Sequence, residues 1–254
     1  MRRSLNCFVV IAIGLTAMPL LAQDLVFKSK SGKATLLELY CSEGCSSCPP
    51  AEAWISNIKS SPGLWSDIFP VAFHVDYWDS HAWVDRFAQP AYTQRQRNYA
   101  AQLKQDGVYT PEFVVNGREW SEWFHSEQKT PAQIETHGNL TLSSIDAGRE
   151  VSAVYSPAGS AGAAMYVLNI ALLGVNIMSD VQHGENGGRK LTHDFVVLDF
   201  KSELMDGGPI SESGHIRLES TTDDPPGAIV AWVSAPDGSI LQMTGGWLKP
   251  TPSK

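Results

Sequence analysis

The segment CSEGCSSCPP, residues 41–50, constrains the fold of this chain more than any other stretch. Its three cysteines directly follow ATLLELY, an apolar run of strand length. Two prolines and AEAWISNIKSS come next, with apolar residues at helical spacing. Proline suits a first helical turn, because the N–H that it lacks would have no partner there. The cysteines are therefore predicted to end a strand and open a helix.

Cys45 and Cys48 have the spacing of a redox-active dithiol. A helix N-terminus offers unpaired N–H groups and the positive end of the helix dipole, which favour a thiolate at Cys45. Cys48 lies about one helical turn further on, so its sulfur can resolve a mixed disulfide formed at Cys45. A metal site and a structural disulfide are the alternatives for the same pair.

The rest of the first half alternates between strand-like and helix-like segments. The Asn-Gly pair at residues 116–117 is a strong hairpin signal. The predicted elements are a strand at residues 70–78, a helix within 84–105 that Pro90 starts or interrupts, a strand at 108–120 and a weaker helix at 131–142.

From residue 150 onward the apolar runs have strand length and are separated by Gly, Pro, Asn and Asp clusters. This pattern predicts an antiparallel sheet or a small sandwich. The segment GENGGRKLTH, residues 184–193, contains an Asn-Gly-Gly core that predicts a tight turn. The alternative is that Glu185, Arg189 or His193 contributes to a cleft shared with the cysteine loop.

The N-terminal segment is built like a secretory signal peptide. Arg2 and Arg3 precede an apolar run from Phe8 to Leu21, which is shorter than the roughly 20 residues that a membrane span needs. We therefore expect a secreted, periplasmic protein whose mature chain does not insert into a membrane. The predicted organisation is a signal peptide at residues 1–22, a first domain at 23–147, a β-rich domain at 148–248 and a disordered tail at 249–254.

The charge balance excludes two classes of partner. The formal net charge is −8, and loss of Arg2 and Arg3 makes the mature chain more acidic. An acidic chain without a long Lys/Arg cluster has no electrostatic surface for nucleic acid or an anionic membrane. Protein thiols and disulfides are the predicted partners.

Over residues 34–142, the order strand, Cys-x-x-Cys-Pro, helix, strand, helix, Thr-Pro, strand, Asn-Gly resembles the thioredoxin-like fold. In that fold a cis-proline beside the active disulfide opens a strand, so the resemblance implies this position for Pro111 in VYTPEFVVNG. The sequence does not determine the isomer. The predicted fold class is an α/β thioredoxin-like domain followed by a β-rich domain.

Longer motifs resemble the domain of unknown function 1223 family of secreted bacterial proteins. They are ELYCSEGCSSCPPAE, FHVDYWD, RQRNYAA, VYTPEFVVNGR and GENGGRKLTHDFVV. The resemblance covers nearly all of the mature chain and implies a thioredoxin-like domain with a C-terminal extension, but no settled substrate. Cys41 stands where the family places a small hydroxyl residue, so no family role is assigned to it.

Further polar residues accompany the cysteines. Glu38 lies near the position where thioredoxin-like enzymes keep a buried acid for the resolving thiol's proton; the alternative is a solvent-facing strand glutamate. His74 and Asp76 share one strand face and could tune the thiolate or shuttle a proton, or form a supporting hydrogen-bonded pair. Arg95 and Arg97 are predicted to form a solvated helix face.

Three functions are compatible with these residues. The first is a thiol-disulfide oxidoreductase without a cofactor, in which Cys45 attacks and Cys48 resolves. The second is a copper or zinc binding or delivery protein that uses Cys41, Cys45, Cys48 and His74, because thiolate-rich sites suit soft ions. Thioredoxin-like copper chaperones have proline directly after their second cysteine, whereas Ser46 follows Cys45 here. The third is a non-catalytic binding module on a thioredoxin-like scaffold.

Overall fold

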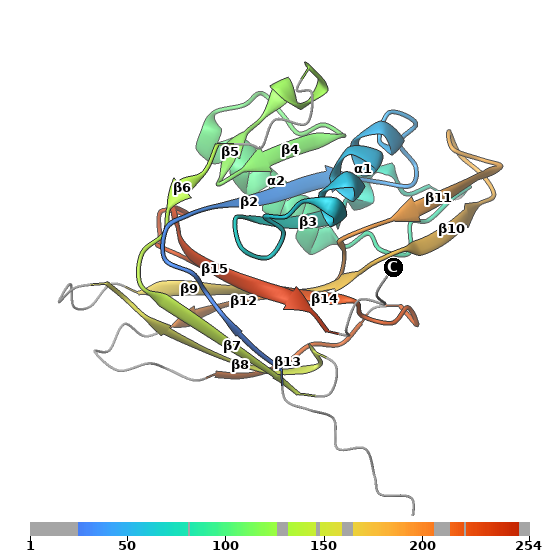
Figure 1. Cartoon of the computed structure of the whole chain (residues 1–254). Helices are drawn as coiled ribbons and strands as arrows, with labels where there is room; N and C mark the ends of the chain where they lie inside the picture. The colour runs from blue at the N-terminus through green and yellow to red at the C-terminus, as the bar shows by residue number, and fades with distance from the viewer. Residues whose placement is uncertain are drawn as a thin grey trace, which may run out of the picture.

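The computed structural model describes residues 25–80, 82–125, 132–145, 148–158, 165–205, 214–220 and 222–248. The predicted signal peptide and the predicted disordered tail lie outside these residues. Within them the chain forms fifteen strands, two α-helices and three short 3-10 helices, arranged as Figure 1 shows.

The helices and the hairpin around the cysteines form where the sequence predicts them, whereas the strand predicted at residues 70–78 ends at His74 and Asp76–Trp78 form a 3-10 helix. Helix α1 begins at Pro49 and helix α2 at Pro90, so both prolines occupy first turns. Asn116 and Gly117 both have positive φ, as a tight hairpin turn requires. The elements are β1 (Leu25–Lys28), β2 (Lys33–Cys41), α1 (Pro49–Ser56), η1 (Asn57–Ser60), β3 (Ile68–His74), η2 (Asp76–Trp78), α2 (Pro90–Leu103), β4 (Glu112–Val115), β5 (Arg118–Glu119) and η3 (Ser121–His125).

The remainder of the described chain is built from strands. The apolar runs of the second half form strands as predicted, whereas the helix predicted at residues 131–142 is wrong, because its described part contains β6 and the start of β7. The elements are β6 (Ile134–Glu135), β7 (Asn139–Ile145), β8 (Glu150–Ser156), β9 (Tyr166–Gly174), β10 (Ile177–Val181), β11 (Arg189–His193), β12 (Val196–Met205), β13 (Gly214–Arg217), β14 (Ala228–Ser234) and β15 (Ile240–Trp247).

Three sheets organise these strands. The largest has nine strands, in the order β15-β14-β9-β12-β3-β2-β4-β5 with β6 paired to β2. Its parallel pairs are β2 with β3 and β3 with β12, the latter through Ala72 and Val196. A four-stranded sheet has the order β1-β7-β8-β13, and β10 and β11 form a separate hairpin, which lies beside α1.

The predicted fold class, an α/β thioredoxin-like domain followed by a β-rich domain, is therefore wrong. The described chain is mainly β, with only two α-helices and several sheets. Strands from both halves of the sequence share the nine-stranded sheet, because β12 pairs with β3 on one side and with β9 on the other. Four strands of the second half, β9, β12, β14 and β15, extend the sheet of the first half, whereas β8 and β13 belong to the four-stranded sheet.

Two cores explain why these runs are almost continuously apolar. Successive strand residues point to opposite faces of a sheet, and a strand that is covered on both faces needs apolar residues at every position. In β9, Ala171 and Leu173 pack in the core that contains the cysteines and α1. Ile170 and Leu172 pack in a second core, against the four-stranded sheet.

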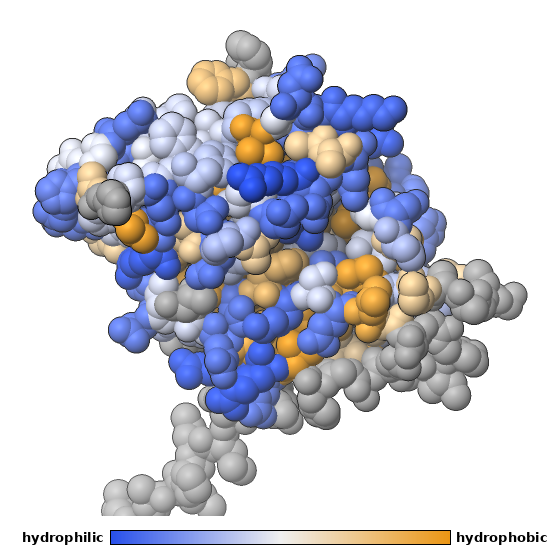
Figure 2. All heavy atoms as spheres, turned by 180° about the vertical axis from the view of Figure 1, so that it is seen from behind, coloured by the Kyte–Doolittle hydropathy of each residue, from blue (hydrophilic) through white to orange (hydrophobic). Residues whose placement is uncertain are grey.

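The surface carries isolated apolar side chains. On the face in Figure 2, the hydrophobic residues form small groups among hydrophilic ones. Exposed large apolar residues of the described chain include Phe124, which is 70% exposed, and Leu204. Neither described α-helix has the length and apolar character that crossing a bilayer requires.

Candidate functional site

The dithiol pair lies in the turn between β2 and α1, just below the surface. Cys45 and Cys48 are both free thiols, and Cys45 is only 1% exposed, although the neighbouring Ser46 and Ser47 are exposed. Cys48 is the N-cap residue of α1, and its carbonyl accepts the N–H of Glu52 at 3.1 Å. The backbone thus brings the pair to the N-terminus of the helix, as the sequence predicted.

The two thiols have opposite pKa shifts. A hydrogen bond from Cys48 lowers the pKa of Cys45 to about 5. Burial opposes this shift, while hydrogen bonds from the Ser47 hydroxyl, 3.1 Å from the sulfur, and from Thr110 reinforce it. Burial raises the pKa of Cys48 far above its ordinary value. At neutral pH the pair therefore consists of a thiolate at Cys45 and a thiol at Cys48.

The structure places Pro111 next to this pair. The peptide bond between Thr110 and Pro111 is cis. The Thr110 carbonyl oxygen is 3.8 Å from the Cys45 sulfur and 3.5 Å from the Ser47 hydroxyl oxygen. The Thr110 hydroxyl in turn accepts a 2.7 Å hydrogen bond from the Trp78 indole. The Thr110-Pro111 segment therefore forms one wall of the dithiol site.

The turn between β10 and β11 covers the cysteine loop from the other side. The tight turn predicted from the Asn-Gly-Gly core forms here, and it also contacts the site. Glu185 accepts hydrogen bonds from the Ser46 N–H and hydroxyl at 3.0 and 2.7 Å. The buried Asn186 amide donates to the carbonyls of Glu43 and Cys45, both at 2.9 Å. Arg189 supports the turn through a 2.8 Å bond to Asn186.

Behind the dithiol lies a buried group of charged residues. We call it the histidine cluster: Cys41, Glu43, Glu52, His74, Asp85 and His193, all of them buried. His74 Nδ1 is 2.6 Å from an Asp85 oxygen. His193 bridges two carboxylates, with Nδ1 at 2.7 Å from Glu52 and Nε2 at 3.1 Å from Glu43. The histidines thus balance the charge of carboxylates contributed by the cysteine loop, α1 and the segment before α2.

These contacts shift the pKa values in the cluster. Burial alone would raise the pKa of Glu52, but His193 and His74 outweigh it and lower that pKa to about 2. Burial also opposes protonation of His74, yet Asp85 and Cys41 hold the pKa of His74 well above its ordinary value. Burial raises the pKa of Cys41 to about 12, against the effect of His74. Cys41 is therefore a thiol unless a further cation joins it.

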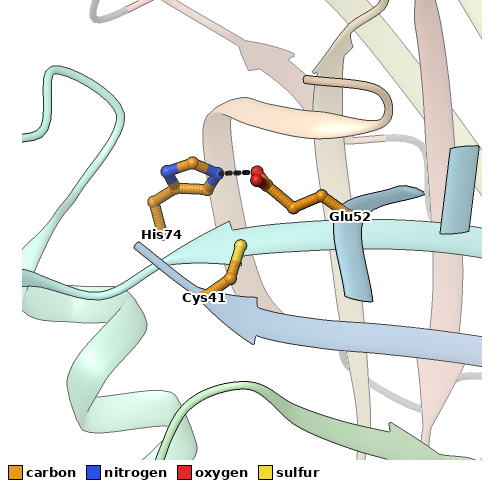
Figure 3. A group of neighbouring side chains, drawn as sticks. All are labelled: Cys41, Glu52 and His74. Carbon is orange, nitrogen blue, oxygen red and sulfur yellow. Dashed lines mark ion pairs between the residues drawn. The ribbon is translucent and has the colours of Figure 1, made fainter. Parts of the chain in front are cut away.

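Three side chains of the cluster converge, as Figure 3 shows. One ligand atom each from Cys41, Glu52 and His74 lies within 4.8 Å of the other two. His74 Nε2 is 3.6 Å from the nearer Glu52 oxygen and, although buried, has no hydrogen-bond partner among the described residues. Of the predicted metal ligands, the structure thus joins Cys41 and His74. Cys45 and Cys48 are not part of this group.

Glu38 lies in a different environment from the cysteines. It is buried, and its oxygens accept bonds from Arg95 Nε at 2.8 Å and from the Tyr99 hydroxyl at 2.7 Å. Arg95 lies against the rings of Phe73, Tyr99, Phe200 and Trp232. The prediction that Arg95 belongs to a solvated face is wrong, because it is the counterion of a buried carboxylate, whereas Arg97 is exposed as predicted.

Sequence reasoning missed several members of the histidine cluster and misjudged a pairing. Asp76, in η2, accepts a hydrogen bond from the Thr93 hydroxyl and does not pair with His74. The carboxylate beside His74 is that of Asp85. The position of Glu52, one helical turn after Cys48, could have placed it under the cysteine loop. Nothing in the local sequence connects Asp85 or Glu43 with His74, because the loop after β3 brings them together.

A groove of about 790 Å³ lies elsewhere on the molecule. It runs between the C-terminal half of α2, the β4–β5 turn and the turn before β15, and Gln102, Arg118, Glu119 and Asp237 are among its lining residues. No cysteine lines it. The candidate site is thus the cysteine loop together with the buried histidine cluster beneath it.

Comparisons with known proteins place the chain in a family. Two solved structures are similar. A protein of Agrobacterium tumefaciens has a TM-score of 0.56 and 20% identity, and the match covers 87% of this chain and 96% of that one. HBP35 of Porphyromonas gingivalis has a TM-score of 0.53 and 15% identity, and the match covers 89% of this chain and 79% of that one. At these identities the likeness shows the fold alone. None of the curated proteins matches the chain. The family described as "Protein of unknown function (DUF1223)" matches residues 36–234, so the chain belongs to that family.

Proposed function

We propose that this protein is a secreted, periplasmic thiol-disulfide oxidoreductase that uses Cys45 as the attacking thiol and Cys48 as the resolving thiol. The observation that carries the proposal is the position of the Cys-x-x-Cys turn at the N-terminus of α1, with the Cys45 sulfur beside the Ser47 hydroxyl and the Thr110 carbonyl; the opposite pKa shifts of the two thiols agree with it. Only the thiolate attacks a disulfide, and a thiolate of low pKa is also a good leaving group. Cys45 is therefore suited to attack the substrate disulfide, and Cys48 is suited to resolve the mixed disulfide.

The exchange proceeds in two steps when the pair starts reduced. The Cys45 thiolate attacks one sulfur of a substrate disulfide, the substrate S–S bond breaks, and one substrate thiolate leaves. Cys48 then loses its proton to that leaving thiolate and attacks the Cys45 sulfur of the mixed disulfide. The second substrate thiolate leaves, the protein holds a Cys45–Cys48 disulfide, and the substrate has gained two electrons. The reverse sequence oxidises a dithiol substrate.

The surroundings support a protein substrate. Ser46 and Ser47 are exposed beside the buried Cys45 sulfur, and the Thr110 carbonyl lies next to it. A partner cysteine must reach the Cys45 sulfur between the exposed serines and the Thr110-Pro111 segment. An extended peptide segment can do so, because its backbone does not cover its cysteine side chain. The acidic charge of the chain gives no attraction to nucleic acid.

Trapping of the mixed disulfide tests the proposal. In a Cys48→Ser variant the first step can occur but the second cannot, so we expect a stable covalent adduct with a disulfide-bonded probe peptide, detected by intact mass. Cys45→Ser, the matched control, should form no adduct and should lose reductase activity toward the peptide. If the Cys48→Ser variant forms no adduct and keeps the activity of the parent protein, the proposal fails.

The pH dependence of alkylation gives a second test. The thiolate is the reactive form, so the rate at Cys45 should be nearly constant from pH 8 to pH 6 and fall as pH drops through about 5. An ordinary cysteine loses its reactivity already below its pKa of about 8.5. Peptide mapping after iodoacetamide treatment assigns the rate to Cys45. A midpoint near that of a free thiol, with no redox exchange, would instead fit a non-catalytic binding module.

Secretion is tested separately. If residues 1–22 are a signal peptide, the protein recovered from a bacterial periplasm should lack them, and intact mass should match a chain that begins near residue 23. A full-length chain in the cytoplasmic fraction would contradict this part of the proposal without affecting the chemistry of Cys45.

A further inference from the structure

We propose that Cys41, Glu52 and His74 form a zinc-type metal site inside the histidine cluster, separate from the Cys45–Cys48 pair. The site would take a divalent cation of the zinc class through the Cys41 thiolate, a Glu52 oxygen and His74 Nε2. This inference does not rest on thiol-disulfide exchange, because neither exchanging sulfur belongs to the three-ligand set.

The geometry of the three atoms is close to a coordination sphere. They lie within 4.8 Å of one another, and His74 Nε2 is 3.6 Å from the nearer Glu52 oxygen. Bonds to zinc of about 2.0 to 2.3 Å in a tetrahedral arrangement place ligand atoms roughly 3.3 to 3.8 Å apart. The histidine–carboxylate separation already fits this range, and the Cys41 sulfur, within 4.8 Å of both atoms, would have to move closer on binding.

His74 Nε2, which has an ion-pair contact with Glu52 at 3.6 Å but no hydrogen bond among the described residues, points to a ligand. Buried nitrogen atoms are nearly always hydrogen-bonded, since leaving one unpaired costs about 1 to 3 kcal/mol. His74 Nε2 is buried and has no hydrogen-bond partner among the described residues, although Figure 3 shows that it faces Glu52 and Cys41. A cation between these side chains would displace the Nε2 proton and bind the nitrogen lone pair.

The partners of the proposed ligands have the arrangement of a metal site's outer shell. A metal-bound histidine usually gives its other ring N–H to a carboxylate, which fixes the ring and its tautomer. Here Asp85 lies 2.6 Å from His74 Nδ1 and is itself held by the Glu43 N–H at 2.8 Å. His193 bonds Glu52 at 2.7 Å. Both the imidazole and the carboxylate ligand are thus held in place by buried residues.

The kind of ligand selects the kind of ion. One thiolate, one imidazole and one carboxylate suit zinc or a similar divalent ion better than copper(I), which favours sulfur-rich sites. All three residues are buried, so the ion would be enclosed and would stabilise the fold. Cys41 lies at the end of β2, His74 at the end of β3 and Glu52 in α1, so one ion would tie together the three elements that carry the cysteine loop.

Metal titration of the full mature chain tests the proposal. The chain is purified with chelator and reductant, refolded with or without Zn²⁺ or Co²⁺, and examined by native mass spectrometry and absorption spectroscopy. We expect one Zn²⁺ per chain, a thiolate-to-cobalt charge-transfer band with Co²⁺, and a higher Tm with zinc. The Cys41→Ser and Glu52→Gln variants should lose stoichiometric binding and the zinc-dependent rise in Tm.

The matched control is the double variant Cys45→Ser/Cys48→Ser, which should bind one Zn²⁺ as tightly as the parent chain and keep the cobalt band. Should the double variant lose binding while Cys41→Ser retains it, zinc is held by the dithiol and the proposal is overturned. Absence of zinc binding by the folded parent chain also overturns it. If Cys41→Ser fails to fold, Asp85→Asn provides the readout, because loss of this partner should weaken binding about 10- to 100-fold.

Discussion

Strand β2 separates two buried charged groups that differ in one respect. On one face, Glu38 is bonded by Arg95 and Tyr99, and aromatic rings enclose the guanidinium. On the other face, Cys41 joins His74 and Glu52, and His74 Nε2 has no hydrogen-bond partner within the described part of the chain. The Glu38 group uses a cation that is always charged, whereas the histidine cluster uses groups that exchange protons and bind metals. We therefore expect the Glu38 group to contribute to stability alone and the histidine cluster to bind the proposed metal ion.

The largest expected effect concerns the Glu38 group. Replacing Arg95 by Met removes the only described cation that is bonded to Glu38 and leaves a buried carboxylate uncompensated. We expect the free energy of unfolding to fall by about 3 to 5 kcal/mol in urea titrations. Arg97→Met on the exposed side of the same helix should change it by no more than about 0.5 kcal/mol. Equal effects of the two substitutions would mean that Arg95 is not a structural counterion.

A smaller effect should distinguish substitutions on the two faces of β2 by how much they weaken zinc binding. Asp85→Asn removes the carboxylate that holds His74 and should weaken zinc binding about 10- to 100-fold, equivalent to roughly 1.4 to 2.7 kcal/mol. Tyr99→Phe removes a hydrogen bond from the Glu38 group and should leave zinc affinity unchanged. Chelator competition measures both. The contrast between the faces breaks down if Tyr99→Phe weakens zinc binding as much as Asp85→Asn does.

The smallest effect concerns the turn that covers the cysteine loop. Asn186→Ala removes two buried hydrogen bonds to the loop backbone and should lower the free energy of unfolding by about 1 kcal/mol. Glu185→Gln alters only an exposed contact with Ser46 and should leave the urea midpoint unchanged. A larger loss for Glu185→Gln than for Asn186→Ala would show that the exposed contact, and not the buried amide, holds the turn in place.

Both prolines that open helices, the Asn-Gly hairpin and the placement of Cys45 and Cys48 at a helix N-terminus were predictable from sequence. Each depends on local rules: proline lacks an N–H, glycine accepts positive φ, and four residues span about one turn of helix. Apolar runs of strand length likewise predicted most strands of the second half. Local periodicity thus located these elements without tertiary information.

The sheet that joins the elements was not predictable in this way. A strand's sequence states whether its faces are buried, but it does not state which strand lies beside it. The pairing of Val196 with Ala72, about 120 residues apart in the chain, replaced the predicted α/β domain and separate β-rich domain by a shared nine-stranded sheet. Long-range pairing of this kind decides fold class, and a single sequence carries no local signal for it.

The same distinction holds for the site. The sequence by itself located the dithiol at a helix N-terminus, because Cys45, Cys48 and the helix that follows them are adjacent in the chain. Only the tertiary structure decided that His74 and Glu52 meet Cys41, that Asp85 and His193 hold them, and that Arg95 is the counterion of Glu38. The physical reason is that a buried charge loses its hydration and therefore needs a partner nearby in space. The pairing of the strands in the sheet decides which residues are nearby.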